Sequence, residues 1–407
     1  MSAVSVGSLP VCQQCTCRPC WTPAPFAADW NHGRRVRRQH GVSRQRNAAA
    51  AVVTGSLPPA AGAAAVKQPS QLQLGVDIPI SLQRVEVGGG PDGNCKAFLL
   101  VVPDIDAVME LYIRAGQNDR DPYWCEPWPS ALAMSAELLR RPDLVAGKRV
   151  CELGCGLGLA GLAAAAAGAA EVVLLDREPL ALQCALLNAA LNGLPAAQPS
   201  AAAVAAAAAD SGGSGASVQP PSLAELLPHL KPADAQLLED WQEQQGQQGG
   251  SHVQANSQGS DTGGGDPVPS SAGSADSAAG RPGLVRVEVF DWSQPVTLAP
   301  HDVMLVCDCL YESFSVEPVA AVAPKLLSRR GSARLLLADP PDRARHNREC
   351  FLDILCEESG EFLLEESSET AVPTWEASKG AWRSVPVMLM HLRRSDGAET
   401  VGVKRRD

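Results

Sequence analysis

The feature that most constrains this chain is the segment VCELGCGLG at residues 150–158. The segment begins with an apolar run that contains β-branched residues, with the acid Glu152 next to its end. Glycines follow directly, and residues 159–170 then form an Ala-rich run of helical composition. Glycine lets a turn approach a ligand closely, and a helix N-terminus offers free N–H groups. The segment therefore predicts a strand, a tight turn and a helix that together hold a small molecule.

The segments around this turn alternate as a parallel sheet requires. Residues 171–176 are expected to form a second strand that ends in Asp176, and residues 179–192 a helix that starts on a proline and stops at Gly193. The other expected strands are 80–87, 97–102, 284–290, 302–307, 333–338, 362–365 and 385–392, and the other expected helices are 104–113, one opening at Ser130, 316–327 and 342–356. This pattern predicts an α/β fold, a Rossmann-like sheet with helices on both faces and an added N-terminal β-hairpin.

The N-terminal segment, residues 1–76, falls outside this pattern. It is rich in Arg, Ser and Ala and contains one acid, Asp29, which is typical of an organelle transit peptide. Its first arginine is Arg18, so we expect a chloroplast address in preference to a mitochondrial one. A disordered tail without an address is the alternative.

A second unusual segment interrupts the domain that we expect to span residues 77–407. Residues 195–283 are low-complexity Ala, Gly, Ser, Gln and Pro, and only residues 222–245 show helical spacing of apolar side chains. Such composition buries too little apolar surface to offset the entropy of ordering. We therefore expect a mostly disordered insertion in a surface loop, which adds nothing to the core.

The charge distribution limits the partners of the chain. The formal net charge is −11, but residues 1–76 carry +7, so the remainder carries −18. An acidic body argues against general nucleic-acid binding and suits a basic protein partner. No stretch reaches the roughly 18 uncharged apolar residues of a membrane helix, so no membrane partner is expected. The oligomeric state stays open.

The 13 cysteines do not suggest a disulfide framework. Their number is odd, and several lie in apolar runs, where reduced thiols act as small core hydrophobes. Cys12, Cys15, Cys17 and Cys20 form a C-x2-C-x-C-x2-C cluster of metal-binding type, but it lies in the expected transit peptide, without folded surroundings. We therefore expect no functional metal site.

Two interpretations of the glycine turn compete. Residues 156–161 match G-x-G-x-x-G, the dinucleotide fingerprint, which carries little weight when it stands alone. The preceding strand, however, ends directly before Gly154, so the turn starts there and uses Gly154, Gly156 and Gly158. The acid Glu152 also suits a ligand with a cationic head group better than a pyrophosphate, which needs N–H donors.

In this second form the turn resembles motif I of the class I S-adenosylmethionine-dependent methyltransferases. More narrowly, the chain resembles their family-16 group, the seven-strand protein-lysine methyltransferases. Four further features match that group in order, over about residues 80–395: Trp128-Pro129, Asp176, Trp292 and the D-x-x-Y motif from Asp308 to Tyr311. The resemblance implies a seven-strand sheet, S-adenosylmethionine as cofactor and a lysine of a protein substrate as methyl acceptor.

One departure from the family concerns the segment after the fifth strand. Asp339–Arg343 is similar to the D-P-G-R stretch of the branch that modifies an electron-transfer flavoprotein subunit, but it has Pro-Asp where that branch has Gly. The substrate therefore does not follow from this segment.

The resemblance also implies a role for each matched residue. Asp176 would accept hydrogen bonds from both ribose hydroxyls, and a surface acid that caps the next helix is the alternative. Trp128 and Trp292 would flank the flat, apolar adenine, although Trp128 could also belong to a hydrophobic lid without a ligand. The remaining expected cofactor residues are Gly154, Gly156 and Gly158 beneath the amino-acid part, Asp291 at the adenine amine, and Glu152, Cys155 and Cys307 around them.

The chemistry of the acceptor points to Asp308 and Tyr311 as the catalytic residues. A sulfonium is a good leaving group, whereas a neutral lysine amine near pH 7.5 costs about 4 kcal/mol. A pocket helps by desolvating the ammonium and by placing its nitrogen in line with the methyl group. We expect Asp308 and Tyr311 to receive and orient the ammonium, with Tyr311 as a simple wall residue the alternative.

Three other functions stay open at this point. The chain could be a small-molecule N- or O-methyltransferase, a non-catalytic scaffold that binds S-adenosylmethionine, or a Rossmann enzyme of another class. Small-molecule enzymes usually close the pocket with extra helices, whereas a short hairpin here favours an open, protein-sized site. The intact D-x-x-Y motif disfavours the scaffold, and a titration with NAD would detect the third class.

Overall fold

The computed structural model describes residues 74–88, 95–117, 120–197, 220–251, 282–376 and 381–395. The expected transit peptide before Leu74, the cysteine cluster and the larger part of the insertion lie outside these residues. In the part that is described, no helix has both the length and the apolar character needed to cross a bilayer.

The element bounds follow the expected order along the chain. The strands are β1 (Ile80–Val87), β2 (Lys96–Pro103), β3 (Arg149–Leu153), β4 (Glu171–Asp176), β5 (Leu284–Val289), β6 (Val303–Cys307), β7 (Arg334–Asp339), β8 (Phe362–Glu376) and β9 (Ala381–Arg394). The helices are α1 (Ile105–Arg114), α2 (Pro129–Arg140), α3 (Leu159–Ala166), α4 (Pro179–Leu191), α6 (Leu223–Leu226), α7 (Pro232–Ser251), α8 (Ser313–Leu326) and α9 (Arg345–Leu352). Short 3-10 turns are formed by Tyr123–Cys125, Pro142–Leu144 and Leu227–His229, and a π-helix by Asp353–Glu358.

Seven strands form one sheet in the order β5-β4-β3-β6-β7-β9-β8. The strands from β5 to β7 are parallel, whereas β9 is antiparallel to both β7 and β8. The predicted α/β sheet and the separate β1–β2 hairpin are therefore confirmed. The strand order reverses between β3 and β6, and the carboxyl ends of strands at such a point form the crevice where ligands bind.

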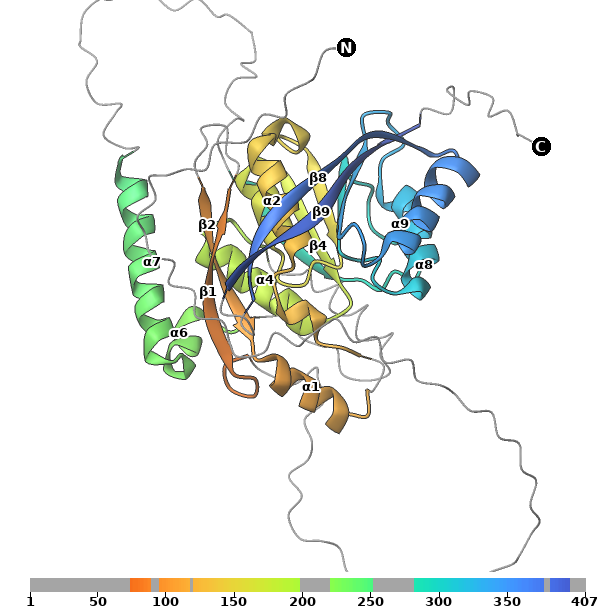
Figure 1. Cartoon of the computed structure of the whole chain (residues 1–407). Coiled ribbons are helices and arrows are strands. Elements are labelled where there is room, and N and C mark those ends of the chain that lie inside the picture. The colour runs from red at the N-terminus through yellow and green to blue at the C-terminus, as the bar shows by residue number, and fades with distance from the viewer. Residues whose placement is uncertain are drawn as a thin grey trace, which may run out of the picture.

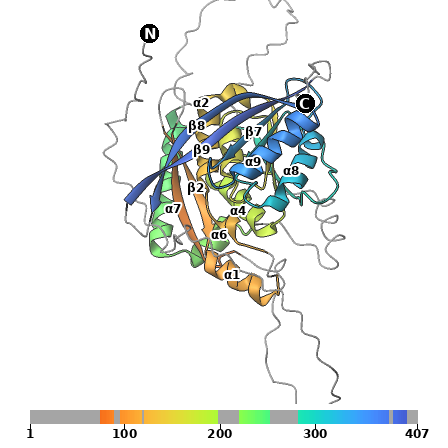
Figure 2. The same ribbon diagram turned by 45° about the vertical axis from the view of Figure 1, so that its right-hand side comes forward.

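Alternate residues of the central strands supply two apolar cores, one on each face of the sheet. Val150 packs in the core that includes α2, α3 and α4, whereas Cys151 and Leu153 pack in the core that includes α8 and α9. Figure 2 shows these two groups of helices on opposite sides of the sheet. Because both faces are covered, the interiors of β4, β6 and β7 are apolar, as their sequences predict, and β3 contains one buried acid, Glu152.

Part of the insertion packs on the domain, so the prediction that it adds nothing to the core is wrong here. Helix α7 lies along β1 (Figure 1), and Trp241 is only 4% exposed. The Trp241 Nε1 donates to the Leu191 carbonyl at 2.7 Å, and Asp234 accepts from the Leu82 N–H at 3.1 Å. The helical spacing of apolar residues over 222–245 did indicate a helix that could pack on the domain. The low-complexity sequence on both sides of it led to the prediction of disorder.

Strands β8 and β9 are much longer than the expected strands 362–365 and 385–392. Pairing of β9 with β7 ends at Met388, and beyond it β8 and β9 continue as a two-stranded ribbon. Residues 365–369 of β8 are exposed and polar. This strand is stabilised by its pairing with β9 and not by burial of one face. An alternation of apolar and polar residues therefore could not reveal it in the sequence.

Candidate functional site

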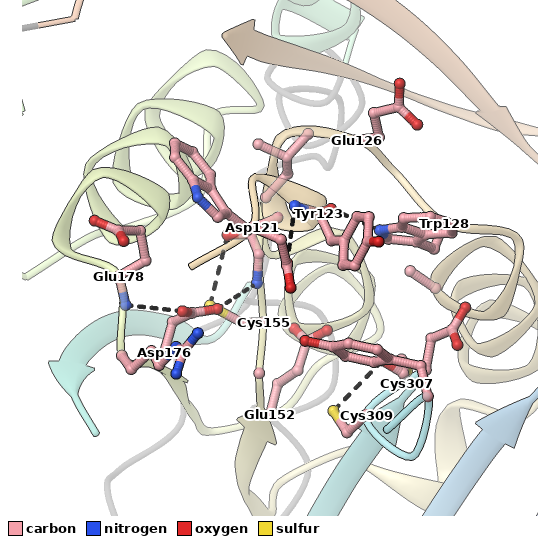
Figure 3. A pocket seen from close by; sticks show the side chains of 18 of the residues that line it. Asp121, Tyr123, Glu126, Trp128, Glu152, Cys155, Asp176, Glu178, Cys307 and Cys309 are labelled. Atoms are coloured by element: carbon pink, nitrogen blue, oxygen red, sulfur yellow. Dashed lines mark hydrogen bonds between the residues drawn. The ribbon is translucent and has the colours of Figure 1, made fainter. Parts of the chain in front are cut away.

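One pocket opens at the carboxyl edge of the sheet, where the strand order reverses (Figure 3). It is lined by all but one of the residues predicted from the sequence: Trp128, Glu152, Gly154, Cys155, Gly156, Asp176, Asp291, Trp292, Cys307, Asp308 and Tyr311. These residues follow β3, β4, β5 and β6 or precede α2. The fold thus brings the separate motifs to one place.

Two glycines of the turn line the pocket and have a backbone conformation that favours glycine. Gly154 and Gly156 have φ values of 62° and 50°, a region that side chains with a Cβ rarely adopt. A Cβ at Gly154 would lie 2.9 Å from the Cys309 Sγ, and one at Gly156 would lie 3.3 Å from the Trp124 carbonyl oxygen. Glycine at these two positions therefore lets Cys309 and Trp124 pack directly against the backbone of the turn.

The predicted residue that does not line the pocket is Gly158, which corrects its expected place beneath the ligand. Gly158 precedes α3 with φ 80°, and a Cβ there would lie 2.9 Å from the Leu174 Cδ1, inside the sheet–helix contact. Glu152 lines the pocket and also holds α3, because its Oε2 accepts from the Gly161 N–H at 2.7 Å. Burial raises the pKa of Glu152 to about 8.

Asp176 is held by the backbone at the end of β4. Its Oδ2 accepts from the Gly156 N–H and its Oδ1 from the Glu178 N–H, both at 2.9 Å. The side chain is 9% exposed, which excludes the alternative of a surface acid. Burial raises the pKa of Asp176 to about 6, against the lowering effect of these two bonds. Each oxygen can accept a further bond, so the carboxylate can receive two hydroxyls of a ligand.

A buried polar network that the sequence did not predict supports this side of the pocket. Glu178 accepts from the Tyr112 hydroxyl at 2.6 Å and from Arg120 at 2.9 Å, and the Trp124 Nε1 donates to the Tyr112 hydroxyl at 2.9 Å. Because these partners lie up to 66 positions apart, no local pattern reveals the network. It fixes the segment before α2 against the start of α4.

Aromatic rings lie between the part of the pocket around Asp176 and the part around Asp308. The Trp128 Nε1 donates to the Tyr123 carbonyl at 2.7 Å, and the Tyr123 ring lies edge-to-face against Trp128 and Tyr311, with centroids at 6.0 and 5.6 Å. Trp292 lines the pocket after β5. The neighbouring Asp291 uses its Oδ1 in its own turn, where it accepts from Ser293.

Asp308 has the most constrained geometry in the site. It is the only non-glycine residue with a positive φ, 57°, among the described residues, and it is 7% exposed. Such a conformation costs on the order of 1–3 kcal/mol and persists where the surroundings impose it. Its Oδ1 forms an ion pair with Arg343, whereas its buried Oδ2 and the neighbouring Ser130 hydroxyl lack a hydrogen bond of ordinary geometry. Burial raises the pKa of Asp308, and the Arg343 charge lowers it.

The sequence did not predict Arg343 as a site residue. It follows β7 in the segment similar to D-P-G-R, and its guanidinium lies 5.2 Å from the centroid of the Trp128 ring. The pair with Asp308 spans 35 positions. The pattern around Arg343 therefore gave no indication of this contact.

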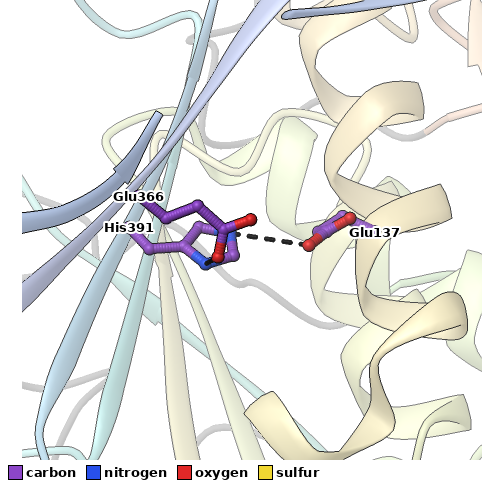
Figure 4. A group of neighbouring side chains, drawn as sticks. All are labelled: Glu137, Glu366 and His391. Carbon is purple, nitrogen blue, oxygen red and sulfur yellow. Dashed lines mark ion pairs between the residues drawn. The ribbon is translucent and has the colours of Figure 1, made fainter. Parts of the chain in front are cut away.

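A second side-chain cluster joins α2 to β8 and β9, in the part of these strands that belongs to the seven-strand sheet (Figure 4). Glu137, Glu366 and His391 each offer a possible metal-ligand atom, and these atoms lie within 4.8 Å of one another. Arg141 Nη1, however, contacts both carboxylates, at 3.3 and 2.8 Å. The guanidinium thus supplies the positive charge between the acids, and the cluster is an ion-pair contact between elements.

Comparison with known proteins gives matches to methyltransferases over part of the chain. Residues 133–211 match the family model "Ribosomal protein L11 methyltransferase (PrmA)". An electron transfer flavoprotein beta subunit lysine methyltransferase from Rattus norvegicus is 45% identical over 74 residues, which are 18% of this chain and 29% of that protein. A ribosomal protein L11 methyltransferase from Aeromonas hydrophila is 44% identical over 63 residues, 14% of this chain and 22% of that protein. The matched segments therefore span less than a third of these relatives.

Among solved structures, a ribosomal protein L11 methylase from Lactobacillus delbrueckii subsp. bulgaricus has a TM-score of 0.33 and 11% identity, over 68% of this chain and 83% of that chain. The matched residues 133–211 contain β3, the glycine turn and β4 with Asp176, and the strand order of the sheet reverses next to β3. Over this part of the chain, the sequence is therefore similar to methyltransferases.

Proposed function

We propose that this chain is an S-adenosylmethionine-dependent protein-lysine N-methyltransferase. The observation that carries the proposal is Asp308, a buried carboxylate in a strained conformation with one unsatisfied oxygen, on the same pocket as the glycine turn. A carboxylate of this kind suits a nitrogen that must be held and oriented. The matched relatives are named for methyl transfer to proteins, which supports a protein as the substrate.

The pocket fits the cofactor by its donor set and shape. Asp176 would accept from the ribose hydroxyls, the backbone over Gly154 and Gly156 would carry the amino-acid part, and Trp292 would contact the adenine. S-adenosylmethionine supplies a methyl group on a sulfonium. The proton of the ammonium would leave to solvent first, the lone pair of the acceptor nitrogen would then form the new N–C bond, and the electrons of the broken S–C bond would stay on sulfur.

Asp308 and Tyr311 would act by orientation. An ionised carboxylate is a weak base, so Asp308 is suited to hold the acceptor nitrogen in line rather than to remove its proton. Burial raises the pKa of Tyr311, so its hydroxyl stays protonated near neutral pH and can hydrogen-bond to the acceptor. Tyr311 also lies against Tyr123, which fixes the ring.

The test is methyl transfer to protein. The purified chain is incubated with radiolabelled S-adenosylmethionine and a plastid extract, and labelled proteins are digested to locate the modified residue. Label on a lysine side chain is the expected result. Label only in small molecules, or cofactor binding without any transfer, would favour one of the two alternative functions.

We also propose that residues 1–76 direct the protein to the chloroplast, on the basis of their basic, acid-poor composition. A fusion of residues 1–76 to a fluorescent protein tests this. Fluorescence in plastids is expected, and fluorescence in mitochondria would support the other address.

A further inference from the structure

Arg343 contacts two residues that line the pocket and come from different elements, Asp308 and Trp128. Its guanidinium pairs with Asp308 at the end of β6 and lies over the ring of Trp128 before α2. The Arg343 side chain is 41% exposed, whereas that of Asp308 is 4% exposed. A half-exposed cation is thus held by a nearly buried anion at the edge of the pocket.

This arrangement leaves one carboxylate oxygen for another partner. The planar guanidinium of arginine holds a carboxylate in a fixed direction, and here it engages Oδ1. The Oδ2 is buried and makes no hydrogen bond of ordinary geometry. An N–H of an acceptor could therefore donate to Oδ2 in place of the neighbouring Ser130 hydroxyl, without breaking the ion pair.

The charge of Arg343 also changes what the carboxylate does to a bound amine. An unpaired carboxylate attracts an ammonium and so stabilises the charged form of the acceptor. A carboxylate that is already paired has little net charge to offer, while its free oxygen still accepts a hydrogen bond. The pair therefore orients an amine and stabilises its ammonium form less than Asp308 would alone.

Resting on the proposed function, we propose that Arg343 is a positioning residue of the acceptor site, which holds Asp308 through Oδ1, leaves Oδ2 for the acceptor nitrogen, and favours the uncharged amine. Other titratable groups near Asp308 contribute to the local charge but are unchanged by a substitution at Arg343. They are Asp339 with its partner Arg348, the thiols of Cys307 and Cys309, and, farther off, Glu152, Asp176, Tyr123, Tyr311, Asp121, Arg177 and Glu312.

The test compares Arg343→Gln with Arg345→Gln. Arg345 belongs to the same segment and pairs with the exposed Asp342, away from Asp308. Single-turnover methyl transfer to a lysine-containing acceptor is measured at saturating S-adenosylmethionine from about pH 6.5 to about pH 10. In the plot of rate against pH, we expect the rising part of the curve for Arg343→Gln to lie about one pH unit higher than for the wild type. The rate of this variant should therefore be about tenfold lower near pH 7 and should recover at high pH.

The controls separate charge from packing. Arg345→Gln should match the wild type, Arg343→Lys should recover part of the rate near pH 7, and the cofactor dissociation constant should change less than about twofold in all three variants. A loss in Arg343→Gln that is equal at every pH would show a purely structural role. A gain near pH 7 would show that Arg343 competes with the acceptor. Either outcome overturns the proposal.

A measurement without turnover distinguishes this proposal from the proposed function. The ¹³C carboxyl resonance of Asp308 should titrate at a higher pH in Arg343→Gln than in the wild type and in Arg345→Gln. Suppose that the wild type modifies lysine, but that Arg343→Gln changes neither the titration of Asp308 nor the dependence of the rate on pH. The role proposed for Arg343 is then wrong. If the titration moves but the wild type modifies no lysine, the proposed function is what has failed.

Discussion

The two halves of the pocket are built by different means. In the half that we propose for the cofactor, backbone N–H groups of Gly156 and Glu178 hold Asp176, and Gly154 and Gly156 form the turn with positive φ values. In the acceptor half, a side chain from a later segment, Arg343, holds Asp308. A site held by the backbone depends on local sequence, whereas one held by side chains depends on distant partners. We therefore expect substitutions in the two halves to separate cofactor binding from methyl transfer.

The largest effect that we expect is on stability and lies outside both halves. Trp241→Ala removes a buried indole and the bond to the Leu191 carbonyl, so the free energy of unfolding should fall by about 3–5 kcal/mol. Denaturant unfolding measures this, with Leu227→Ala, 46% exposed, as a control within about 0.5 kcal/mol of wild type. A changed cofactor affinity in folded Trp241→Ala would mean that the insertion also supports the cofactor half.

The next largest effect is on the acceptor half. Asp308→Ala should lower the single-turnover rate at least about 100-fold, because the group that orients the nitrogen is lost. The exposed Asp342→Ala, from the segment that contains Arg343, is the matched control and should keep the wild-type rate. An unchanged rate in Asp308→Ala would remove Asp308 from the mechanism.

In the cofactor half, Asp176→Ala should weaken binding of S-adenosylmethionine by about 1.5–3 kcal/mol in calorimetry, through loss of charge-assisted hydrogen bonds. Because burial raises the pKa of Asp176 to about 6, the wild-type affinity should fall as the pH drops through that value and the carboxylate becomes protonated. The variant should lack this fall. Asp291→Ala should have a smaller effect, since one of its oxygens serves its own turn. Equal affinities of wild type and Asp176→Ala would contradict its role.

The smallest effect tests whether Tyr311 acts through its hydroxyl. Tyr311→Phe keeps the ring that packs against Tyr123 and removes one hydrogen bond, so we expect a rate about tenfold lower, near 1.4 kcal/mol. Tyr123→Phe is the matched control for the ring pair. A wild-type rate in Tyr311→Phe would leave Tyr311 as a wall residue.

The parts of the site that the sequence predicted are those that follow from local chemistry and sheet topology. A glycine turn after a strand and acids at the ends of parallel strands must meet at one edge of the sheet, so Gly154, Asp176 and Asp308 could be placed together beforehand. Gly158 was misplaced because its spacing in the turn does not show which way the missing side chain would point.

The parts that the sequence did not predict depend on long-range contacts. The partners of Asp308 and Glu178 lie far along the chain, with Arg343 at 35 positions from Asp308 and Tyr112 at 66 positions from Glu178. Helix α7 was hidden by the low-complexity residues around it, and the ribbon of β8 and β9 by its exposed polar faces. In each case tertiary pairing, not local propensity, decides the structure.

The most direct test of the division between the halves measures two quantities on the same preparations of Asp176→Ala and Asp308→Ala. These are the dissociation constant of S-adenosylmethionine and the single-turnover rate at saturating cofactor. We expect Asp176→Ala to bind the cofactor more weakly by about 1.5–3 kcal/mol and to keep a rate within about threefold of wild type. Asp308→Ala should show the reverse, with affinity within about threefold and a rate at least about 100-fold lower. If Asp308→Ala abolishes cofactor binding, or if each variant loses both properties, the two halves act as one unit and their separation is contradicted.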